Sequence, residues 1–252
     1  MREDVRQFVA IAAQAFRLTG PVYEFGSYLV ADQGDLGDLR SLFPGQRYVG
    51  CDMRPGPGVD QIEDLGELSL PDDSAQSIIC VDTLEHVFEV RRAVDEMTRV
   101  LAPGGVLVLA VPFDFYIHNY PADYWRFTPS CLERLLAPLP AVVIGSQGTE
   151  TSPHTVFAVA SKGPVGAHFA AGYEQLATGM RSYLAAQAAA VPPKVRAKQA
   201  LRRWFQSQRE RRRVEEYHQS RFTLEMRIQV PAATPHARIQ PARSAEMRFD
   251  WT

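Results

Sequence analysis

Four acidic residues and one glycine stand at or next to the positions where short apolar segments of the sequence end. They are Glu24, Gly26, Asp52, Asp64 and Asp82. The apolar segments have the length of buried strands, and in an open α/β sheet ligands bind outside the carboxyl ends of the strands. There a carboxylate can accept hydrogen bonds from ribose hydroxyls, and the backbone at a glycine can approach a ligand closely. The pattern predicts a site for a nucleotide-like ligand, whereas each carboxylate taken alone is equally well explained as a solvated loop residue.

The turn at Gly26 departs from the glycine pattern of dinucleotide sites. Ser27 and Tyr28 follow it, where G-x-G-x-x-G would place further small residues. Asp52 follows Gly26 at an interval comparable with the roughly 20 residues typical of a ribose-binding carboxylate. The missing glycines therefore count against a bound pyrophosphate, while the carboxylate still indicates an adenosine-like group.

A second group of reactive side chains lies in an aromatic segment, residues 113–128, directly after the apolar run 106–111. Its candidate substrate-binding residues are Tyr116, Asp123, Tyr124 and Arg126. Because loops beyond strand ends commonly carry binding residues, we expect this segment to cover the cleft. The alternative is a local hydrophobic plug in which Arg126 pairs with Asp123 or another acid, and the two roles can coexist.

Two histidines near these segments are candidate general bases. A base with a pKa near 7 helps to remove the proton of a hydroxyl nucleophile. His118, within the aromatic segment, is the first catalytic candidate, and His86, which follows the apolar run 77–81, is the second. A capping or packing role for His86 is an equal alternative.

The elements that must position these residues alternate between strand and helix. Apolar runs of strand length occupy residues 22–25, 48–51, 59–62, 77–81, 106–111, 142–145 and 156–160. Helices are indicated at 3–18, 38–43, 90–101 and 129–136, the last with Thr128 as N-cap and Pro129 at the first position. We therefore expect an α/β fold with a Rossmann-like, doubly wound, seven-stranded and mostly parallel sheet, in a domain of residues 1–163.

Residues 164–252 are expected to form a helical basic extension with an irregular tail. An alanine-rich helix is indicated at 167–190 and a basic helix at 194–217, and the tail begins at residue 229. Residues 1–163 hold 12 basic and 22 acidic residues, whereas residues 164–252 hold 15 and 7. This contrast favours docking of the basic helix on the first domain or on a second subunit, as in a homodimer, over binding to nucleic acid or an anionic membrane.

Composition sets further limits. The three cysteines, Cys51, Cys80 and Cys131, have no Cys/His spacing suited to zinc, so no metal site is expected. No run approaches 18 consecutive apolar residues, and the N-terminal pattern is amphipathic rather than that of a secretory leader. We therefore expect a cytoplasmic protein without a membrane span.

Five motifs occur in order along the first domain. They are Val-Tyr-Glu-Phe-Gly-Ser at 22–27, Tyr-Val-Gly-Cys-Asp at 48–52, Glu-Asp-Leu at 63–65, Cys-Val-Asp-Thr-Leu-Glu-His-Val at 80–87 and Arg-Val-Leu-Ala-Pro-Gly-Gly-Val-Leu at 99–107. Together they resemble the class I S-adenosylmethionine-dependent methyltransferases, particularly the small-molecule group called type 11. The Asp-Tyr-Trp-Arg-Phe-Thr-Pro run at 123–129 is also similar to members of this group. The resemblance covers roughly residues 20–162.

The resemblance implies S-adenosylmethionine as the cofactor and S-adenosylhomocysteine as its product. The implied cofactor-binding residues are Glu24, Gly26 and Ser27 at the methionine part, Asp52 at the ribose, Met53, Asp64 and Leu65 at the adenine, and Asp82 and Thr83 near the sulfonium. A sulfonium cofactor carries no pyrophosphate, so the reduced glycine turn is compatible with it.

The expected function is methyl transfer to a small or medium-sized acceptor, with oxygen as the favoured atom and a biosynthetic pathway as the setting. Two alternatives stay open. One is a non-catalytic binding or assembly module that works through the basic C-terminal segment. The other, less favoured, is a nucleic-acid methyltransferase, whose binding would depend strongly on salt.

Overall fold

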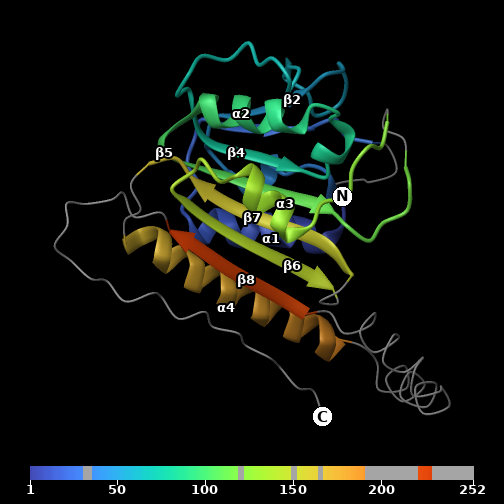
Figure 1. The fold of residues 1–252 in the computed structure, drawn as a ribbon, viewed down its shortest axis with the longest axis vertical. Helices are drawn as coiled ribbons and strands as arrows, with labels where there is room; N and C mark the ends of the chain where they lie inside the picture. Colours follow the sequence, from blue (N-terminus) through green and yellow to red (C-terminus); the bar gives the residue numbers. More distant parts are fainter. Residues whose placement is uncertain (31–35, 119–121, 149–151, 164–166, 191–220, 229–252) are drawn as a thin grey trace.

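A single sheet with helices on both faces forms the body of the molecule (Figure 1). The structure is a computed structural model that describes residues 1–30, 36–118, 122–148, 152–163, 167–190 and 221–228. Among these residues no helix has the length and apolar character needed to cross a membrane.

The sheet has the order β3-β2-β1-β4-β5-β7-β6-β8. The strands are β1 (Val22–Phe25), β2 (Tyr48–Asp52), β3 (Gln61–Ile62), β4 (Ala75–Val81), β5 (Leu101–Pro112), β6 (Ala141–Gly148), β7 (Pro153–Ser161) and β8 (Arg221–Ile228). The β3–β2, β2–β1, β1–β4 and β4–β5 pairs are parallel, whereas the β5–β7, β7–β6 and β6–β8 pairs are antiparallel. After β1 the chain builds outward to β3 on one side and then returns to add β4 on the other. The strand order therefore reverses between β1 and β4, which is where such sheets bind ligands.

Within the described residues, four α-helices cover the two faces of the sheet. Helices α1 (Glu3–Ala15) and α4 (Ala167–Ala190) share one core with alternate sheet residues such as Ile79 and Val108, while α2 (Val90–Val100) and α3 (Pro129–Leu135) share the other with Ile78 and Leu107. Because successive strand residues point to opposite faces, the continuous apolar runs of the sequence supply both cores. The expected doubly wound α/β fold is confirmed.

The expected start of α3 is confirmed, whereas the helix expected at 38–43 is shorter than predicted. Thr128 caps α3 by accepting a hydrogen bond from the Cys131 amide (3.2 Å), and Pro129 is the first helical residue. The helix expected at 38–43 is only a short 3₁₀ turn, η2 (Arg40–Leu42), and a similar turn, η3 (Leu84–His86), follows β4.

The expectation of seven strands, with a helical extension and an irregular tail, did not include one further strand. Residues 221–228 form an eighth strand that pairs with β6 along its whole length. Their sequence, Arg-Phe-Thr-Leu-Glu-Met-Arg-Ile, alternates polar and apolar residues, which is the period of a strand with one covered face. The hydroxyl of Tyr173 on α4 donates to the Leu224 carbonyl (3.2 Å), so the two described parts of the extension contact each other.

Two other expectations for the extension concern residues that the structure does not describe. The basic helix at 194–217 and the tail from residue 229 lie outside the described residues. The division into domains at residue 163 stays a prediction.

Candidate functional site

The turn after β1, at Gly26, lies directly against Thr83, the second residue after the end of β4. Gly26 has a φ of +87°, and a methyl group on its Cα would overlap Oγ1 of Thr83 and lie 2.7 Å from Cγ2. The Thr83 hydroxyl donates to the Val81 carbonyl (2.8 Å), which holds the side chain in this position. The sheet therefore brings two sequence-predicted residues together at its reversal point, and only glycine fits at position 26.

The segment that follows Gly26 packs along the loop after β2. The amides of Gly26 and Ser27 both donate to the Cys51 carbonyl, at 2.8 and 3.0 Å, and the Leu29 amide donates to the Pro57 carbonyl (2.9 Å). These amides are used inside the fold and do not form a cradle for phosphate. The hydroxyl oxygen of Ser27 is buried next to Gly50 of β2 and has no hydrogen-bond partner among the described residues.

Asp52, at the end of β2, is partly covered by Arg54. Its Oδ1 accepts from the Arg54 amide (3.0 Å) and lies 3.4 Å from Nε, while the guanidinium lies over the Tyr28 ring, 4.6 Å from its centroid. Met53, in contrast, is 58% exposed, which leaves its thioether available for packing. A ribose at Asp52 would share this carboxylate with Arg54.

Asp64 and Leu65 follow β3 at the same edge of the sheet. Asp64 is exposed and accepts from the Gly66 amide (2.8 Å), whereas Leu65 is buried. Asp52 and Ile62 are register partners, and the Glu63 amide donates to the Asp52 carbonyl (3.0 Å). The sheet thus places the predicted ribose and adenine residues next to each other.

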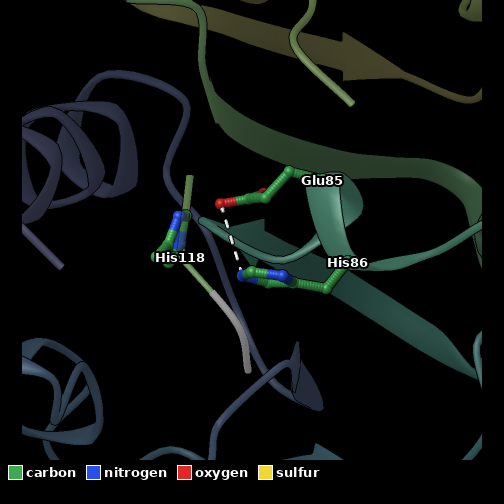
Figure 2. Close-up of side chains that lie close together, drawn as sticks. All are labelled: Glu85, His86 and His118. Carbon is green, nitrogen blue, oxygen red and sulfur yellow. Dashed lines mark ion pairs between the residues drawn. The ribbon is translucent and has the colours of Figure 1, made fainter. Parts of the chain in front are cut away.

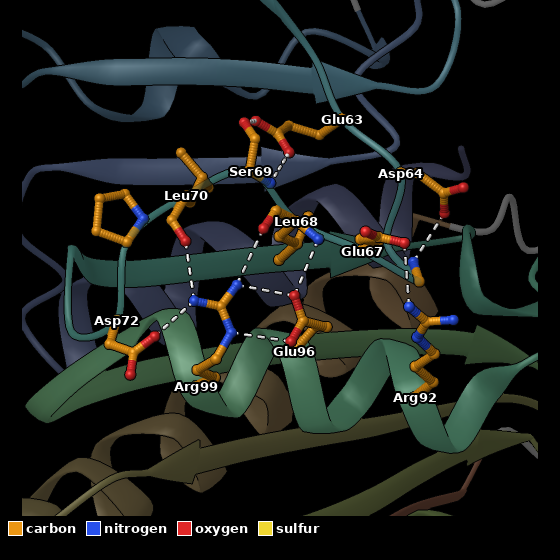
Figure 3. A network of polar contacts seen from close by, with 12 residues as sticks. Glu63, Asp64, Glu67, Leu68, Ser69, Leu70, Asp72, Arg92, Glu96 and Arg99 are labelled. Atoms are coloured by element: carbon orange, nitrogen blue, oxygen red, sulfur yellow. Dashed lines mark hydrogen bonds and ion pairs between the residues drawn. The ribbon is translucent and has the colours of Figure 1, made fainter.

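A polar network holds the segment that carries Asp64 against α2 (Figure 3). The guanidinium of Arg99 donates to the carbonyls of Leu68 (3.0 Å) and Leu70 (2.9 Å), and Glu96 accepts from both Arg99 (2.8 Å) and the Leu68 amide (2.9 Å). These hydrogen bonds to Glu96 raise the pKa of Arg99 and lower that of Glu96. Sequence reasoning did not single out Arg99. The residue positions a loop by hydrogen bonds to its backbone carbonyls.

Glu24 is buried inside β1 and pairs with the hydroxyl of Tyr48 on β2. Burial raises the pKa of its carboxyl to about 7. The side chain lies on the face of the sheet that α1 covers, since Tyr48 belongs to that core. Among the described residues, the hydrogen-bond partner of the Glu24 carboxylate is therefore Tyr48, a residue of the neighbouring strand β2.

Asp82 follows β4 in a left-handed conformation, with φ of +46°. Its amide donates to the Ala110 carbonyl of β5 (2.9 Å), and burial raises the pKa of its carboxyl. A non-glycine residue in this region carries backbone strain of about 1–3 kcal/mol, which is common at binding sites. Asp82 and Thr83 thus occupy the carboxyl end of the central strand, as the sequence indicated.

The aromatic segment is closed by an ion pair between Arg126 and Asp123. Two nitrogens of Arg126 lie 2.6 and 2.8 Å from the two oxygens of Asp123, and Arg126 also donates to the Tyr116 carbonyl (2.9 Å). Hydrogen bonds from Arg126 hold the pKa of Asp123 well below its usual range. This is the pairing expected of a local hydrophobic plug. The Tyr116 and Tyr124 residues of the same segment, in contrast, are 72% and 50% exposed and are not buried in such a plug.

The two candidate histidines meet at a third residue, Glu85, as Figure 2 shows. Nδ1 of His118 lies 3.2 Å from Asp123, and the His118 and His86 rings lie 4.9 Å apart. Nε2 of His86 lies 3.8 Å from the carboxylate of Glu85, which is 1% exposed. Sequence reasoning missed Glu85, although it directly precedes His86.

Comparison with known proteins gives two matches at the level of sequence. Residues 42–109 match the family model described as a methyltransferase domain. A probable S-adenosylmethionine-dependent methyltransferase of Mycolicibacterium smegmatis is 36% identical over 94 residues, which are 35% of this chain and 34% of that protein. The chain thus spans about a third of the length of this curated relative. These matches confirm the resemblance that the motifs indicate.

Solved structures with a similar arrangement are more distant. A 1,6-didemethyltoxoflavin-N1-methyltransferase of Burkholderia thailandensis, solved with S-adenosylhomocysteine, has 17% identity and a TM-score of 0.47, covering 64% of this chain and 79% of its own. An S-adenosylmethionine-dependent methyltransferase of Mesorhizobium loti has 14% identity and a TM-score of 0.45, covering 60% and 98%.

Proposed function

We propose that this chain is an S-adenosylmethionine-dependent methyltransferase that acts on a small or medium-sized acceptor, at oxygen, in a biosynthetic pathway. The observation that carries the proposal is the contact between Gly26 and Thr83 at the point where strand order reverses, with Asp52 at the end of the adjacent strand. The match over residues 42–109, which includes Asp52 and Thr83, supports it.

The proposed cofactor position follows the strand ends. The methionine part lies by Glu24, Gly26 and Ser27, the ribose by Asp52, the adenine by Met53, Asp64 and the Leu65 backbone, and the sulfonium by Asp82 and Thr83. The cofactor has no phosphate, so the use of the Gly26 and Ser27 amides inside the fold is no obstacle.

Methyl transfer itself requires an in-line approach of the acceptor to the sulfonium methyl group, and binding supplies mainly proximity and orientation. A bond forms between the acceptor oxygen and the methyl carbon, and the carbon–sulfur bond breaks with its electrons going to sulfur. The acceptor proton goes to His118. Asp123, 3.2 Å from His118 Nδ1, orients the ring and stabilises the cation that forms.

His86 is the second proposed base. Burial lowers the pKa of His86, which keeps the ring neutral and able to accept a proton. Its Nδ1 contacts the Ala122 carbonyl, so the other ring nitrogen carries the lone pair. The exposed rings of Tyr116 and Tyr124 are the proposed surface for the acceptor, and Asp123 and Arg126 hold the segment that carries them.

The setting of the enzyme is part of the proposal. We place it in the cytoplasm, since Cys51 and Cys80 are free, buried thiols, as a reducing compartment allows. A homodimer through the C-terminal helices is the proposed assembly.

Calorimetric titration with S-adenosylhomocysteine tests the cofactor assignment. The unmodified chain should bind, and Asp52→Ala should weaken binding by about ten- to a hundredfold, because a charge-assisted hydrogen bond is worth about 1.5–3 kcal/mol. Asp95→Ala, which removes an exposed acid on α2, is the matched control and should leave binding unchanged. Absence of binding by the unmodified chain would sink the proposal.

A further inference from the structure

The carboxylate of Glu85 is buried without a hydrogen-bonded partner. The side chain is 1% exposed, and neither oxygen makes a hydrogen bond to another residue within the described part of the chain. Buried carboxylates are normally paired, hydrogen-bonded or bound to a metal, so this side chain requires a partner.

His86 presents its lone pair to this carboxylate. Its Nδ1 contacts the Ala122 carbonyl and therefore carries the proton, which leaves Nε2 as the basic nitrogen. The distance of 3.8 Å from Nε2 to Glu85 Oε1 is too long for a hydrogen bond. Two metal ligands at about 2.1 Å from one tetrahedral ion lie about 3.4 Å apart, so these two atoms need to approach by only a few tenths of an ångström.

His118 completes the set from a different element. Its Nδ1 lies 3.2 Å from Asp123 and 3.3 Å from the Tyr116 carbonyl, so Nδ1 carries the proton and Nε2 the lone pair. A carboxylate behind a histidine is the usual way in which proteins orient a histidine ligand. One ligand atom from each of Glu85, His86 and His118 lies within 4.8 Å of the others, and the three side chains converge in Figure 2.

We propose that Glu85, His86 and His118 form a binding site for one divalent first-row transition-metal ion. Two imidazoles and one carboxylate suit Zn²⁺ or Fe²⁺ rather than Mg²⁺ or Ca²⁺, which prefer oxygen ligands. The ligand atoms lie within 4.8 Å of one another, so the widest separation must close by up to about 1.4 Å, and His118 can supply this because it lies in a loop. Spacing along the sequence did not indicate the site, since α2 and β5 separate His86 from His118.

Binding of the ion does not depend on methyl transfer. A role in catalysis rests on the proposed function: an acceptor hydroxyl bound to the ion has a lowered pKa, so its proton leaves to water and the oxygen becomes the nucleophile. In the metal-loaded chain the ion would then replace His118 as the group that activates the acceptor.

The test is a titration of the metal-free full chain with Zn²⁺, followed by competition with a chromophoric chelator. The unmodified chain should bind one equivalent tightly. His86→Ala, His118→Ala and the isosteric Glu85→Gln should each weaken that site by at least about tenfold. His168→Ala, which removes an exposed histidine on α4, is the matched control and should keep it. No binding by the unmodified chain, or equal binding by all the variants, would overturn the site.

Two further measurements keep the result interpretable. Zn²⁺ should raise the thermal midpoint of the unmodified chain by more than that of His118→Ala, which changes a loop and leaves the core intact. An equal rise in both proteins would contradict the site. Titration with S-adenosylhomocysteine in the presence of a chelator reports on the proposed function separately, so failure of one proposal does not imply failure of the other.

Discussion

Gly26 faces Thr83 so closely that no side chain fits between them. The two residues follow β1 and β4, the strands on either side of the reversal of strand order, and an added methyl group would overlap Oγ1 and lie 2.7 Å from Cγ2. This contact fixes the distance between the two strand ends at which the cofactor is proposed to bind. Gly26 therefore has a packing role in addition to its role in the turn after β1.

Gly26→Ala should therefore destabilise the fold and weaken the cofactor site. Gly104→Ala is the matched control, because Gly104 has a similar φ of +79° with nothing within 4 Å of the added carbon. Both variants carry backbone strain, but only Gly26→Ala adds overpacking, which costs about 1–3 kcal/mol. Urea unfolding should show that difference between the variants, and equal losses would mean that Thr83 moves aside freely.

Glu24 should make stability fall as the pH rises. Burial raises the pKa of its carboxyl from 4.5 to about 7, so between these values the folded chain holds a proton that the unfolded chain has released. Stability is then lost through this window and is constant above it, with a total of about 3 kcal/mol. The measurement is the free energy of unfolding in urea at several pH values from 5 to 8.

Glu24→Gln isolates this effect, because it keeps the size and removes the titration. The unmodified chain should lose stability relative to this variant as the pH rises, and parallel profiles would exclude Glu24 as the cause. Tyr48→Phe removes the hydrogen bond that lowers the Glu24 pKa, so it should move the window to higher pH.

The residues at strand ends could be predicted from the sequence because their positions follow from local patterns. A run of apolar residues marks a buried strand, and in a parallel sheet the residue after it must lie at the carboxyl edge. Gly26, Asp52 and Asp82 were located in this way. The side-chain partners of Asp52 and Glu24 were not predicted, since Arg54 reaches Asp52 and Tyr48 reaches Glu24 through side-chain geometry that no periodicity encodes.

Two larger features depended on contacts between distant parts of the chain. The alternation in 221–228 is visible in the sequence, but its pairing with β6 depends on a free sheet edge that exists only after folding. The approach of His118 to Glu85 similarly depends on the path of the loop after β5, which Arg126 and Asp123 determine.

Arg99→Met should loosen the segment that carries Asp64 and Leu65. The variant keeps the apolar stem but removes the hydrogen bonds to the carbonyls of Leu68 and Leu70, so we expect a loss of about 1–2 kcal/mol in urea unfolding. Affinity for S-adenosylhomocysteine, measured by calorimetry, should fall several-fold. Arg92→Met is the control: its exposed pair with Glu67 contributes at most about 1 kcal/mol.

His118→Ala should abolish most turnover while leaving cofactor affinity unchanged. Loss of a positioned general base typically lowers the rate by about 10²–10⁴-fold, and the ring lies in the loop rather than at the strand ends that are proposed to bind the cofactor. The measurement is kcat with an acceptor found by screening for methyl transfer, beside the Kd for S-adenosylhomocysteine. His168→Ala should behave as the unmodified chain, and full activity of His118→Ala would remove His118 from the mechanism.

The same assay, repeated with a chelator, separates the two ways in which His118 can act. If His118 removes the acceptor proton itself, the unmodified chain should keep its turnover without metal, since the contact of Asp123 with the ring involves no ion. If an ion held by Glu85, His86 and His118 activates the acceptor, turnover should disappear with the metal and return on addition of Zn²⁺ or Fe²⁺. His118→Ala should then stay inactive with either ion, because the ligand itself is missing.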